Sequence, residues 1–303
     1  MSVIERQIIE SFKDEGFQNL TKIQSISIPV IARMKNCLLV APTGSGKTEA
    51  SIIPIFSLLE NDRDNKINLT DNNAIIVLYI TPLRALNNDV LRRIINYAKK
   101  RNLDAQIRHG DTTRTARQKL IIKPPHILIT TPESLGIILT HEKLKSYLKH
   151  LRWVIVDEVH ELIGNERGTH LTVSLERLEN ISSHNVVRIG LSATVGNLKD
   201  AANFISGTNR KCAILVDNTI RKYDIDVKYL KGSISNVAKF VIKYLNDNKI
   251  CGSILLFTNT RDEAEYIGTT IRNLNDIPIE VHHGSLSRET REETEIKLRE
   301  GLT

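Results

Sequence analysis

The sequence has few cysteines, no long apolar run and fewer acidic than basic side chains. Its three cysteines, Cys37, Cys212 and Cys251, are far apart and form no CxxC pair, which argues against a disulfide framework and a cysteine-based zinc cluster. No stretch of 18 or more apolar residues occurs, so no transmembrane helix is predicted, and residues 1–6 do not begin a signal peptide. We therefore expect a soluble, cytoplasmic protein without a membrane partner.

The composition is that of a globular protein with a basic excess. The chain has 303 residues, of which 41% are hydrophobic and 25% charged, and this length favours about two domains. The formal net charge is +7. Residues 84–119 contain ten lysines and arginines and three aspartates, so the basic excess is concentrated there. A phosphate backbone could lie against such a surface, although solvated helix faces have the same composition.

A glycine-rich stretch, Val-Ala-Pro-Thr-Gly-Ser-Gly-Lys-Thr at residues 40–48, lies between a short apolar run and a helical pattern. Glycines let such a loop curl until its N–H groups face a polyphosphate, and the N-terminus of the following helix favours the anion. Lys47 is expected to reach the β- and γ-phosphates of ATP, and the Thr48 hydroxyl to ligate Mg²⁺. Ala41 departs from the strict motif, which has glycine there. The ATP-binding residues predicted here are Thr43, Gly44, Ser45, Gly46, Lys47 and Thr48.

Two adjacent carboxylates end an apolar run at residues 151–156. Mg²⁺ on a nucleotide needs a carboxylate in its coordination sphere, and hydrolysis needs a second one to activate the attacking water. We assign Asp157 to the metal and Glu158 to the water, so that Lys47, Asp157 and Glu158 form the predicted catalytic set. His160 follows, and it either links the nucleotide to neighbouring motifs or is an ordinary surface histidine.

Short hydroxyl side chains follow another apolar run, at residues 186–191. Ser192 and Thr194 can bridge a neighbouring acidic motif at the tip of a strand, or they can simply form a turn. Near the N-terminus two helical patterns meet around Gly16. In this joint Gln24 could bond adenine through its amide and Phe17 could lie against the ring, although an isolated Phe and Gln are more often core and surface residues.

Apolar runs of strand length alternate with helical patterns through the first two thirds of the chain. Such alternation predicts a parallel α/β sheet with right-handed crossovers and with its ligands at the carboxyl ends of the strands. Two of the runs end in Thr-Pro followed by a helix. These segments could present hydroxyls and helix N-termini to phosphates, or Thr-Pro could simply be a favourable start for a helix. The predicted strands are at 37–40, 74–80, 105–108, 126–130, 151–156 and 186–191.

The pattern becomes polar around residues 216–222, where we place a domain boundary. The predicted division is a first domain at 1–216, a linker at 217–231 and a second domain at 232–303. Strand and helix patterns alternate again beyond the boundary. They predict strands at 225–230, 253–261 and 277–282 and helices at 237–246, 261–273 and 287–300.

With these residues in view, the sequence resembles superfamily 2 helicases, and within them the large helicase-related (Lhr) family. Phe17 and Gln24 look like the adenine-reading element, and the DEVH at 157–160 looks like motif II. The other matching segments, in chain order, are motif I at 41–48, motif Ia at 81–89, motif Ib at 130–135, motif III at 192–194, motif IV at 257–261 and a nucleic-acid-facing element at 282–287.

The resemblance implies tandem RecA-like domains, the second incomplete, and a monomeric ATP- and Mg²⁺-dependent helicase. It would act 3′ to 5′ on single-stranded or forked DNA, with RNA-containing duplexes also possible. Coupling is implied for His160, Ser192 and Thr194. Nucleic-acid contacts are implied for Pro82, Arg84, Asn87, Thr131, Pro132, Glu133, Thr258, Arg261 and His283.

The matching stops before motifs V and VI, the latter supplying arginines to the ATP site in such helicases. We therefore expect a truncated helicase, without the winged-helix and accessory domains of the family. An arginine of this kind contributes about 10³ to 10⁵ in rate in related phosphoryl-transfer enzymes. Two alternatives stay open: an ATP- and nucleic-acid-binding module with little turnover alone, and a translocase that does not unwind.

Overall fold

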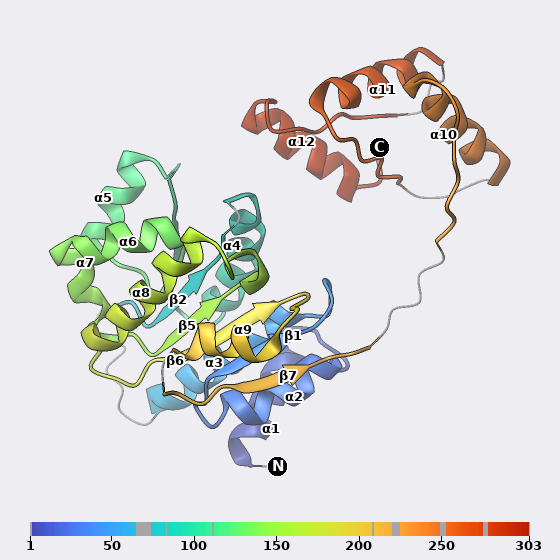
Figure 1. The fold of residues 1–303 in the computed structure, drawn as a ribbon. Helices are drawn as coiled ribbons and strands as arrows, with labels where there is room; N and C mark the ends of the chain where they lie inside the picture. The colour runs from blue at the N-terminus through green and yellow to red at the C-terminus, as the bar shows by residue number, and fades with distance from the viewer. Residues whose placement is uncertain are drawn as a thin grey trace. The chain divides into compact units, whose positions relative to one another are not determined.

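The computed structural model describes residues 2–64, 74–82, 84–110, 112–207, 209–219, 225–248, 253–274 and 278–302. The chain divides into two compact units, residues 1–221 and residues 222–303, whose elements are labelled in Figure 1. None of the helices among the described residues has the length and apolar character that crossing a membrane requires.

A seven-stranded sheet forms the centre of the first unit. Its strands lie in the order β3-β4-β2-β5-β6-β1-β7, and every neighbouring pair is parallel. The carboxyl ends of all these strands therefore meet at one edge. The strands are β1 (Cys37–Val40), β2 (Val77–Ile80), β3 (Ala105–Arg108), β4 (Ile127–Thr130), β5 (Trp153–Val156), β6 (Val187–Ser192) and β7 (Ala213–Val216).

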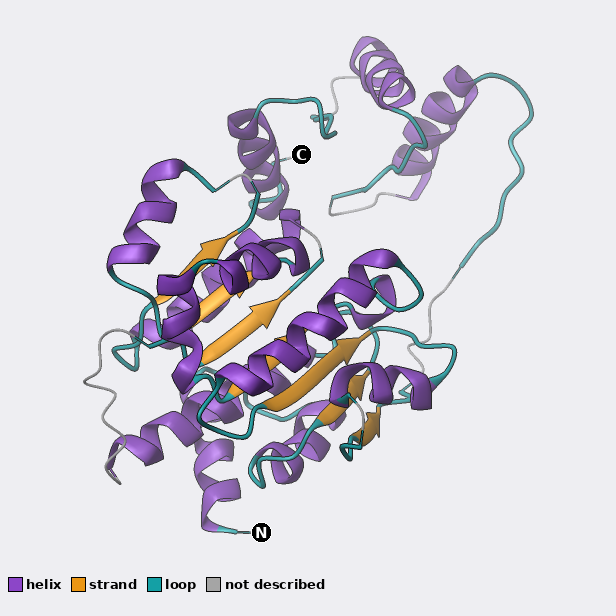
Figure 2. Ribbon diagram, turned by 60° about the vertical axis from the view of Figure 1, so that its left-hand side comes forward, coloured by secondary structure: helices purple, strands orange, loops and turns teal. Residues whose placement is uncertain are grey.

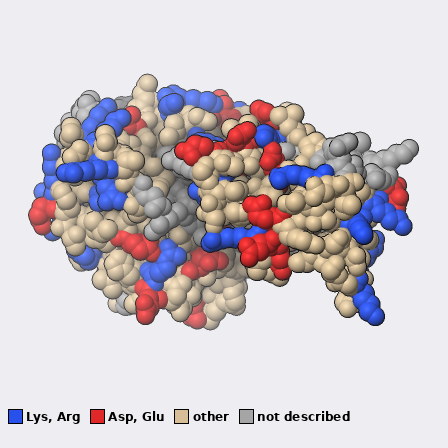
Figure 3. Space-filling view, turned by 90° about the horizontal axis from the view of Figure 1, so that it is seen from above, with Lys and Arg blue, Asp and Glu red and all other residues tan. Residues whose placement is uncertain are grey.

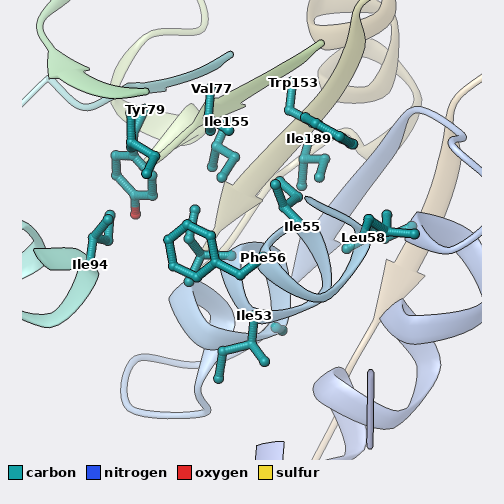
Figure 4. Close-up of a cluster of buried hydrophobic side chains, with 14 of the residues drawn as sticks. Ile53, Ile55, Phe56, Leu58, Val77, Tyr79, Ile94, Trp153, Ile155 and Ile189 are labelled. Atoms are coloured by element: carbon teal, nitrogen blue, oxygen red, sulfur yellow. The ribbon is translucent and has the colours of Figure 1, made fainter. Parts of the chain in front are cut away.

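Helices cover both faces of this sheet, as Figure 2 shows. Successive strand residues point to opposite faces, so Leu39 packs in the core beneath α1 to α4 and Leu38 packs in the core beneath α5 to α9. The first core joins Phe56 to Tyr79 and Trp153 (Figure 4). The helices are α1 (Val3–Asp14), α2 (Lys22–Ile31), α3 (Lys47–Asp64), α4 (Arg84–Lys99), α5 (Arg114–Ile122), α6 (Pro132–Thr140), α7 (Glu142–Ser146), η1 (Tyr147–His150), η2 (Val159–Glu161), α8 (Glu166–Ile181) and α9 (Leu198–Ser206).

Strand β7 and helix α9 of the first unit are elements that the sequence analysis did not predict. Strand β7 has four residues, none of them buried, although its sequence, Ala-Ile-Leu-Val, is wholly apolar and was a readable signal. Helix α9 begins after Asn197, whose side chain accepts the N–H groups of Lys199 and Asp200. This N-cap and the apolar spacing of Leu198, Ala201 and Ile205 are a readable signal.

The second unit contains the three expected helices, α10 (Ile234–Asn248), α11 (Arg261–Leu274) and α12 (Arg288–Arg299). The strand predictions there are wrong, because the described parts of 225–230, 253–261 and 278–282 pair with no neighbouring strand. An apolar run becomes a strand only when another backbone satisfies its N–H and C=O groups. Here Phe257 is 87% exposed. The buried core of this unit, among its described residues, consists of Ala238, Ile267 and Ile271.

A buried arginine of β6 contacts α8, the helix before this strand, and α9, the helix after it. Arg188 is 1% exposed, and its guanidinium donates to Glu176 Oε1 at 2.9 Å, to the Leu175 carbonyl at 2.9 Å and to Glu179 Oε2 at 3.4 Å. Arg210 also contacts Glu176 at 2.9 Å, but its side chain is 30% exposed. The two arginines thus share one carboxylate in different solvent environments.

Replacing Arg188 with Met should lower the free energy of unfolding of the first unit by about 2 kcal/mol, because the buried Leu175 carbonyl loses its charged donor and the partly exposed Glu176 and Glu179 lose their cation. Arg210→Met is the matched control and should cost less than about 1 kcal/mol, since water replaces the lost contact. Urea denaturation followed by fluorescence of Trp153, the single tryptophan and fully buried in this unit, measures both. Equal decreases in the free energy of unfolding of the two variants would contradict a larger stabilising contribution from the buried Arg188.

Candidate nucleotide site and nucleic-acid interface

The loop between β1 and α3 has the backbone curl expected of a phosphate-binding loop. Gly44 has a φ of 69° and Gly46 a φ of 85°, conformations in which a side chain is strained. Lys47 begins α3 and folds back, so that its Nζ donates to the carbonyls of Ala41 at 2.6 Å and Pro42 at 3.0 Å. A nearly buried ammonium is therefore held over the loop, where an incoming polyphosphate could exchange with the two carbonyls.

Two hydroxyl residues of the loop differ in their surroundings. The Ser45 hydroxyl is buried and has no hydrogen-bond partner among the described residues, whereas Thr43 is exposed at the tip. Buried polar atoms in native proteins are nearly always paired. An oxygen of a bound phosphate would supply the partner that Ser45 lacks.

Gln24 lies directly against the loop. Its Oε1 accepts the N–H of Thr21 at 2.9 Å and completes a capping box at the start of α2. The buried Nε2 has no partner among the described residues, and a Cβ on Gly46 would lie 2.5 Å from it. Phe17 packs edge-on against Phe12 with ring centroids 5.7 Å apart. Because Gln24 Oε1 already accepts a hydrogen bond, Nε2 is the side-chain atom available to adenine in this conformation. The bidentate adenine contact therefore stays a prediction.

The first carboxylate of the DEVH segment is held on both of its oxygens. Asp157 follows β5, and its N–H donates to Ile80 of β2 at 2.7 Å. Asp157 Oδ2 accepts the hydroxyl of Tyr79 at 2.5 Å, and Oδ1 accepts the N–H of Glu158 at 2.9 Å. Burial raises the pKa of Tyr79, and an interaction with the Thr48 side chain acts against the rise. Both predicted Mg²⁺ ligands, Asp157 and Thr48, thus lie around one phenol oxygen.

Burial opposes the charge on both carboxylates. The pKa of Asp157 is raised by burial, although the hydrogen bonds from Tyr79 and the backbone and the charge of Lys47 act against the rise. The pKa of Glu158 is raised first by burial and then by the neighbouring Asp157, while His160 and Lys47 lower it. A carboxylate with a raised pKa is a better proton acceptor, which suits the general base predicted at Glu158.

Glu158 also has a strained backbone and an unpaired oxygen. Its φ and ψ are 48° and 49°, the left-handed region that side chains other than Asn, Asp and Gly rarely adopt. Its Oε2 is buried without a hydrogen bond among the described residues and lies 3.6 Å from His160 Nδ1. Strain and an unpaired carboxylate are typical of functional sites rather than of stabilising structure.

The predicted coupling residues form a connected chain. His160 Nδ1 lies 3.1 Å from the Ser192 hydroxyl, which donates to the Thr194 carbonyl at 3.0 Å. The Ser192 carbonyl in turn accepts the N–H of Ala41 at 3.1 Å. Motif II, motif III and the first residue of the phosphate-binding loop are therefore in contact.

The oxygen atoms around Tyr79 fit Mg²⁺ bound with a nucleotide. Mg²⁺ prefers oxygen ligands and is commonly held by one or two carboxylates together with substrate phosphates and waters. Each Asp157 oxygen keeps a lone pair beyond its one hydrogen bond, and the Thr48 hydroxyl is beside it. No cluster of three or more His, Cys, Asp or Glu side chains suited to a metal occurs in the part of the chain that the structure describes. This chemistry fits a metal that arrives with its phosphates.

An arginine that the sequence did not single out ties motif Ia to motif Ib. Arg167 donates from Nε to Glu133 at 2.6 Å and from Nη2 to the Pro82 carbonyl at 3.0 Å. Burial acts to raise the pKa of Glu133, but hydrogen bonds from Arg167, the backbone and Thr131, together with the charge of Arg167, give a net lowering. Thr131 is the N-cap of α6 and Pro132 its first residue, both buried. Glu133 is thus paired within the protein.

Helix α4, which begins within motif Ia, is joined to α3, the helix that follows the phosphate-binding loop. Arg84 and Asn87 belong to α4, but their side chains lie outside the described residues. Further along α4, Arg93 pairs with Glu49 of α3 at 2.9 Å. Glu49 follows Thr48 directly, so this ion pair connects the nucleotide loop with the predicted nucleic-acid face.

Part of the basic excess between residues 84 and 119 is neutralised inside the fold. Lys100 and Arg101 both pair with Glu15, at 2.7 Å and 2.6 Å. Lys99, Lys119 and the arginines of α5 remain exposed. In Figure 3 basic and acidic side chains are interspersed over the face that is drawn. On this face, therefore, the cations are separate and do not form a single-signed stripe.

In the second unit the predicted contacts surround the start of α11. Thr258 donates to the Thr260 carbonyl at 3.0 Å, and the Thr260 hydroxyl caps the helix. Arg261 is the first residue of α11 and is exposed. His283 lies 2.8 Å from Glu265 of the same helix. Within this unit, therefore, Thr258, Arg261 and His283 gather near one end of α11.

Two residues with clear roles in this geometry were missed, Tyr79 and Arg167. A tyrosine in an otherwise aliphatic strand is a detectable signal, because a buried phenol needs a hydrogen-bond partner. Arg167 gives no such signal, since an arginine on a helix usually points to solvent.

Replacing Glu158 with Gln should raise the free energy of unfolding at pH 8 by about 1 kcal/mol, because a buried carboxylate next to another one is removed. The raised pKa of Glu158 sets the sign of the pH dependence. The folded state binds the proton more tightly, so wild-type stability falls as pH rises from about 4.3, the ordinary value for glutamate, through the folded pKa.

The gap between the variant and the wild type should accordingly widen over that range and stay constant above it. Urea denaturation at several pH values tests this. A Glu158→Gln protein no more stable than the wild type at pH 8 would show that the carboxylate is well accommodated in the fold.

Comparison with known proteins places this geometry in a family. The profile of the DEAD/DEAH box helicase family matches residues 21–201. The chain is 38% identical over 323 residues to the ATP-dependent helicase Lhr-Core of Saccharolobus solfataricus, covering 98% of this chain and 36% of that protein. It is also 38% identical over 327 residues to the Lhr-Core helicase of Methanocaldococcus jannaschii, covering 99% and 37%. The chain thus spans little more than a third of the length of these relatives.

A solved structure agrees with the sequence comparison. The structure of Mycobacterium smegmatis helicase Lhr bound to ssDNA and AMP-PNP matches with a TM-score of 0.76 and 32% identity, over 99% of this chain and 40% of that one. The match extends to the RecA-like arrangement expected of a helicase, with a parallel sheet between two layers of helices. The chain belongs to the DEAD/DEAH box helicase family.

Proposed function

We propose that this chain binds ATP with Mg²⁺ and uses its hydrolysis to move along nucleic acid, as the motor part of an Lhr-type helicase. The observation that carries the proposal is the meeting of Lys47, Thr48, Asp157 and Glu158 at the carboxyl edge of the parallel sheet. The similarity to Lhr helicases, one of them bound to ssDNA and AMP-PNP, supports it.

Each residue of the site has a role in this proposal. The Lys47 ammonium leaves the carbonyls of Ala41 and Pro42 and pairs with the terminal phosphates. Thr48 and Asp157 hold Mg²⁺, which neutralises charge on the phosphate oxygens when bound. Glu158, with its raised pKa, orients the water and accepts its proton.

Coupling to nucleic acid would pass through two sets of side-chain contacts. His160 and Ser192 connect motif II to motif III and the loop, and the Arg93–Glu49 pair connects α3 to α4. The first path begins at His160, two residues from Glu158, and the second begins at Glu49, next to Thr48. A change in the loop on hydrolysis would therefore be transmitted to α4, the helix that begins within motif Ia.

The partner we propose is single-stranded or forked DNA, with RNA-containing duplexes as an alternative. The predicted contacts are Pro82, Arg84, Asn87, Thr131, Pro132 and Glu133 in the first unit and Thr258, Arg261 and His283 in the second. Groups that face a phosphate backbone carry little sequence information, so binding should depend weakly on base sequence. We further propose a monomeric, cytoplasmic protein with domains at 1–216 and 232–303 joined by a linker at 217–231.

Binding without rapid turnover is a second candidate function. It is favoured by the second unit, whose described residues bury only a small apolar cluster and pair into no strand. With so small a core the second unit would not supply the closure that hydrolysis requires, and the first unit would bind the nucleotide without rapid turnover.

Glu158→Gln should keep the affinity for AMP-PNP but lower DNA-stimulated ATP hydrolysis at least about 100-fold, because the general base is removed while the loop is intact. Glu161→Gln, three residues along and at a solvent-exposed side chain, is the matched control and should hydrolyse ATP like the wild type. Phosphate release with and without single-stranded DNA, together with titrations of a fluorescent AMP-PNP, measures both properties.

Equal hydrolysis by the wild type and Glu158→Gln would rule out the assigned mechanism. AMP-PNP binding with no DNA-stimulated hydrolysis by the wild type would favour the binding module for this chain. A strand-displacement assay tests the third alternative, a translocase that does not unwind. Such a translocase would clear a protein from DNA without separating the strands.

A further inference from the structure

Tyr79 is a buried tyrosine that the proposed function does not yet use. It lies in the middle of β2, its side chain is 0% exposed, and its ring belongs to the core that includes Phe56 and Ile94 (Figure 4). Phenylalanine would fill the space of the ring equally well. The hydroxyl is therefore the feature that needs an explanation.

The hydroxyl of Tyr79 joins two elements that carry the predicted metal ligands. It donates to Asp157 Oδ2, directly after β5, at 2.5 Å, and it interacts with the Thr48 side chain, in the first turn of α3. The other oxygen of Asp157 is fixed by the Glu158 N–H at 2.9 Å. The carboxylate is consequently restrained at both oxygens and cannot rotate without losing a bond.

A buried phenol that only fills a core would need nothing more than a main-chain acceptor. Tyr147 is such a case, since it is nearly buried and its hydroxyl donates to the Ile121 carbonyl at 2.8 Å. Tyr79 instead contacts two functional side chains. Mg²⁺ demands close to ideal octahedral geometry, so restraint of its ligands before binding has a direct use.

We propose that Tyr79 is a positioning residue for Mg²⁺ in the nucleotide complex, holding Asp157 and Thr48 in the orientation that the metal requires. The proposal rests on the assignment of these two residues to Mg²⁺ above. Tyr79 itself does not touch the metal or the nucleotide, and it acts through the two ligands.

The test is the dependence of nucleotide affinity on the metal. Tyr79→Phe removes one oxygen atom and keeps the ring. Fluorescent AMP-PNP is titrated into the whole chain at a series of Mg²⁺ concentrations and in EDTA. Tyr79→Phe should need about tenfold more Mg²⁺ for half-maximal enhancement, the effect typical of losing a residue that orients a metal ligand. Its metal-free affinity should equal that of the wild type, because the loop and Lys47 are unchanged.

Titration with Ca²⁺ distinguishes a positioning role from a general loss of structure, because a general loss would affect the two metals equally. Ca²⁺ accepts flexible geometry and longer bonds, so the same titration with Ca²⁺ should show a much smaller change in Tyr79→Phe. Tyr147→Phe is the matched control: it also deletes one buried hydroxyl but should leave both metal dependences as in the wild type. Thermal unfolding confirms that the variants are folded. Should Tyr79→Phe not fold, 4-methylphenylalanine at position 79 fills the space of the hydroxyl without donating.

An unchanged Mg²⁺ requirement in folded Tyr79→Phe would overturn the proposal, as would tighter Mg²⁺ binding, which would mean that the phenol competes with the metal. Equal losses with Mg²⁺ and Ca²⁺ would also overturn it, by showing a general disturbance. Failure of the wild type to bind AMP-PNP at all would instead refute the proposed function. The two failures are therefore distinguishable.

Discussion

Parallel pairing of the strands in the first unit is the constraint on which the candidate site depends. Because all strands run the same way, the segments that follow them leave the sheet at one edge. The hydrogen bonding continues past the strand ends: Asp157 donates to Ile80, and Ala41 donates to Ser192. Backbone bonds thus set the spacing between the phosphate-binding loop, motif II and motif III before any side chain contributes. Side chains then refine the positions.

The site is held together at a cost in stability. Asp157 and Glu158 are adjacent carboxylates with raised pKa values, Glu158 has a left-handed backbone, and its Oε2 has no hydrogen-bond partner among the described residues. Features of this kind persist where the surrounding structure over-determines them. Here the surroundings are the apolar strands on both sides of β5. The stable sheet therefore carries a strained edge, and the strain lies where hydrolysis is proposed.

The sequence predicted those parts of the structure that depend on local pattern. Lys47, Thr48, Asp157 and Ser192 could be placed at one edge because short apolar strands alternate with helices and parallel strands end together. Residues whose role depends on a distant partner could not be placed. Tyr79 meets Asp157 across 78 positions and Arg167 meets Pro82 across 85, and no local periodicity reports such contacts. The strands predicted in the second unit failed for a related reason, because an apolar run such as that before Phe257 becomes a strand only with a partner.

We propose that one edge of this sheet binds ATP and its metal through the loop, Thr48 and Asp157. A crystal structure of the chain with AMP-PNP and Mn²⁺, with the metal located by its anomalous scattering, tests this binding directly. We expect an anomalous peak beside Thr48 and Asp157, phosphates on the loop between β1 and α3, and Lys47 turned from its two carbonyls to the nucleotide. A nucleotide bound elsewhere, or a metal away from Asp157, would contradict it.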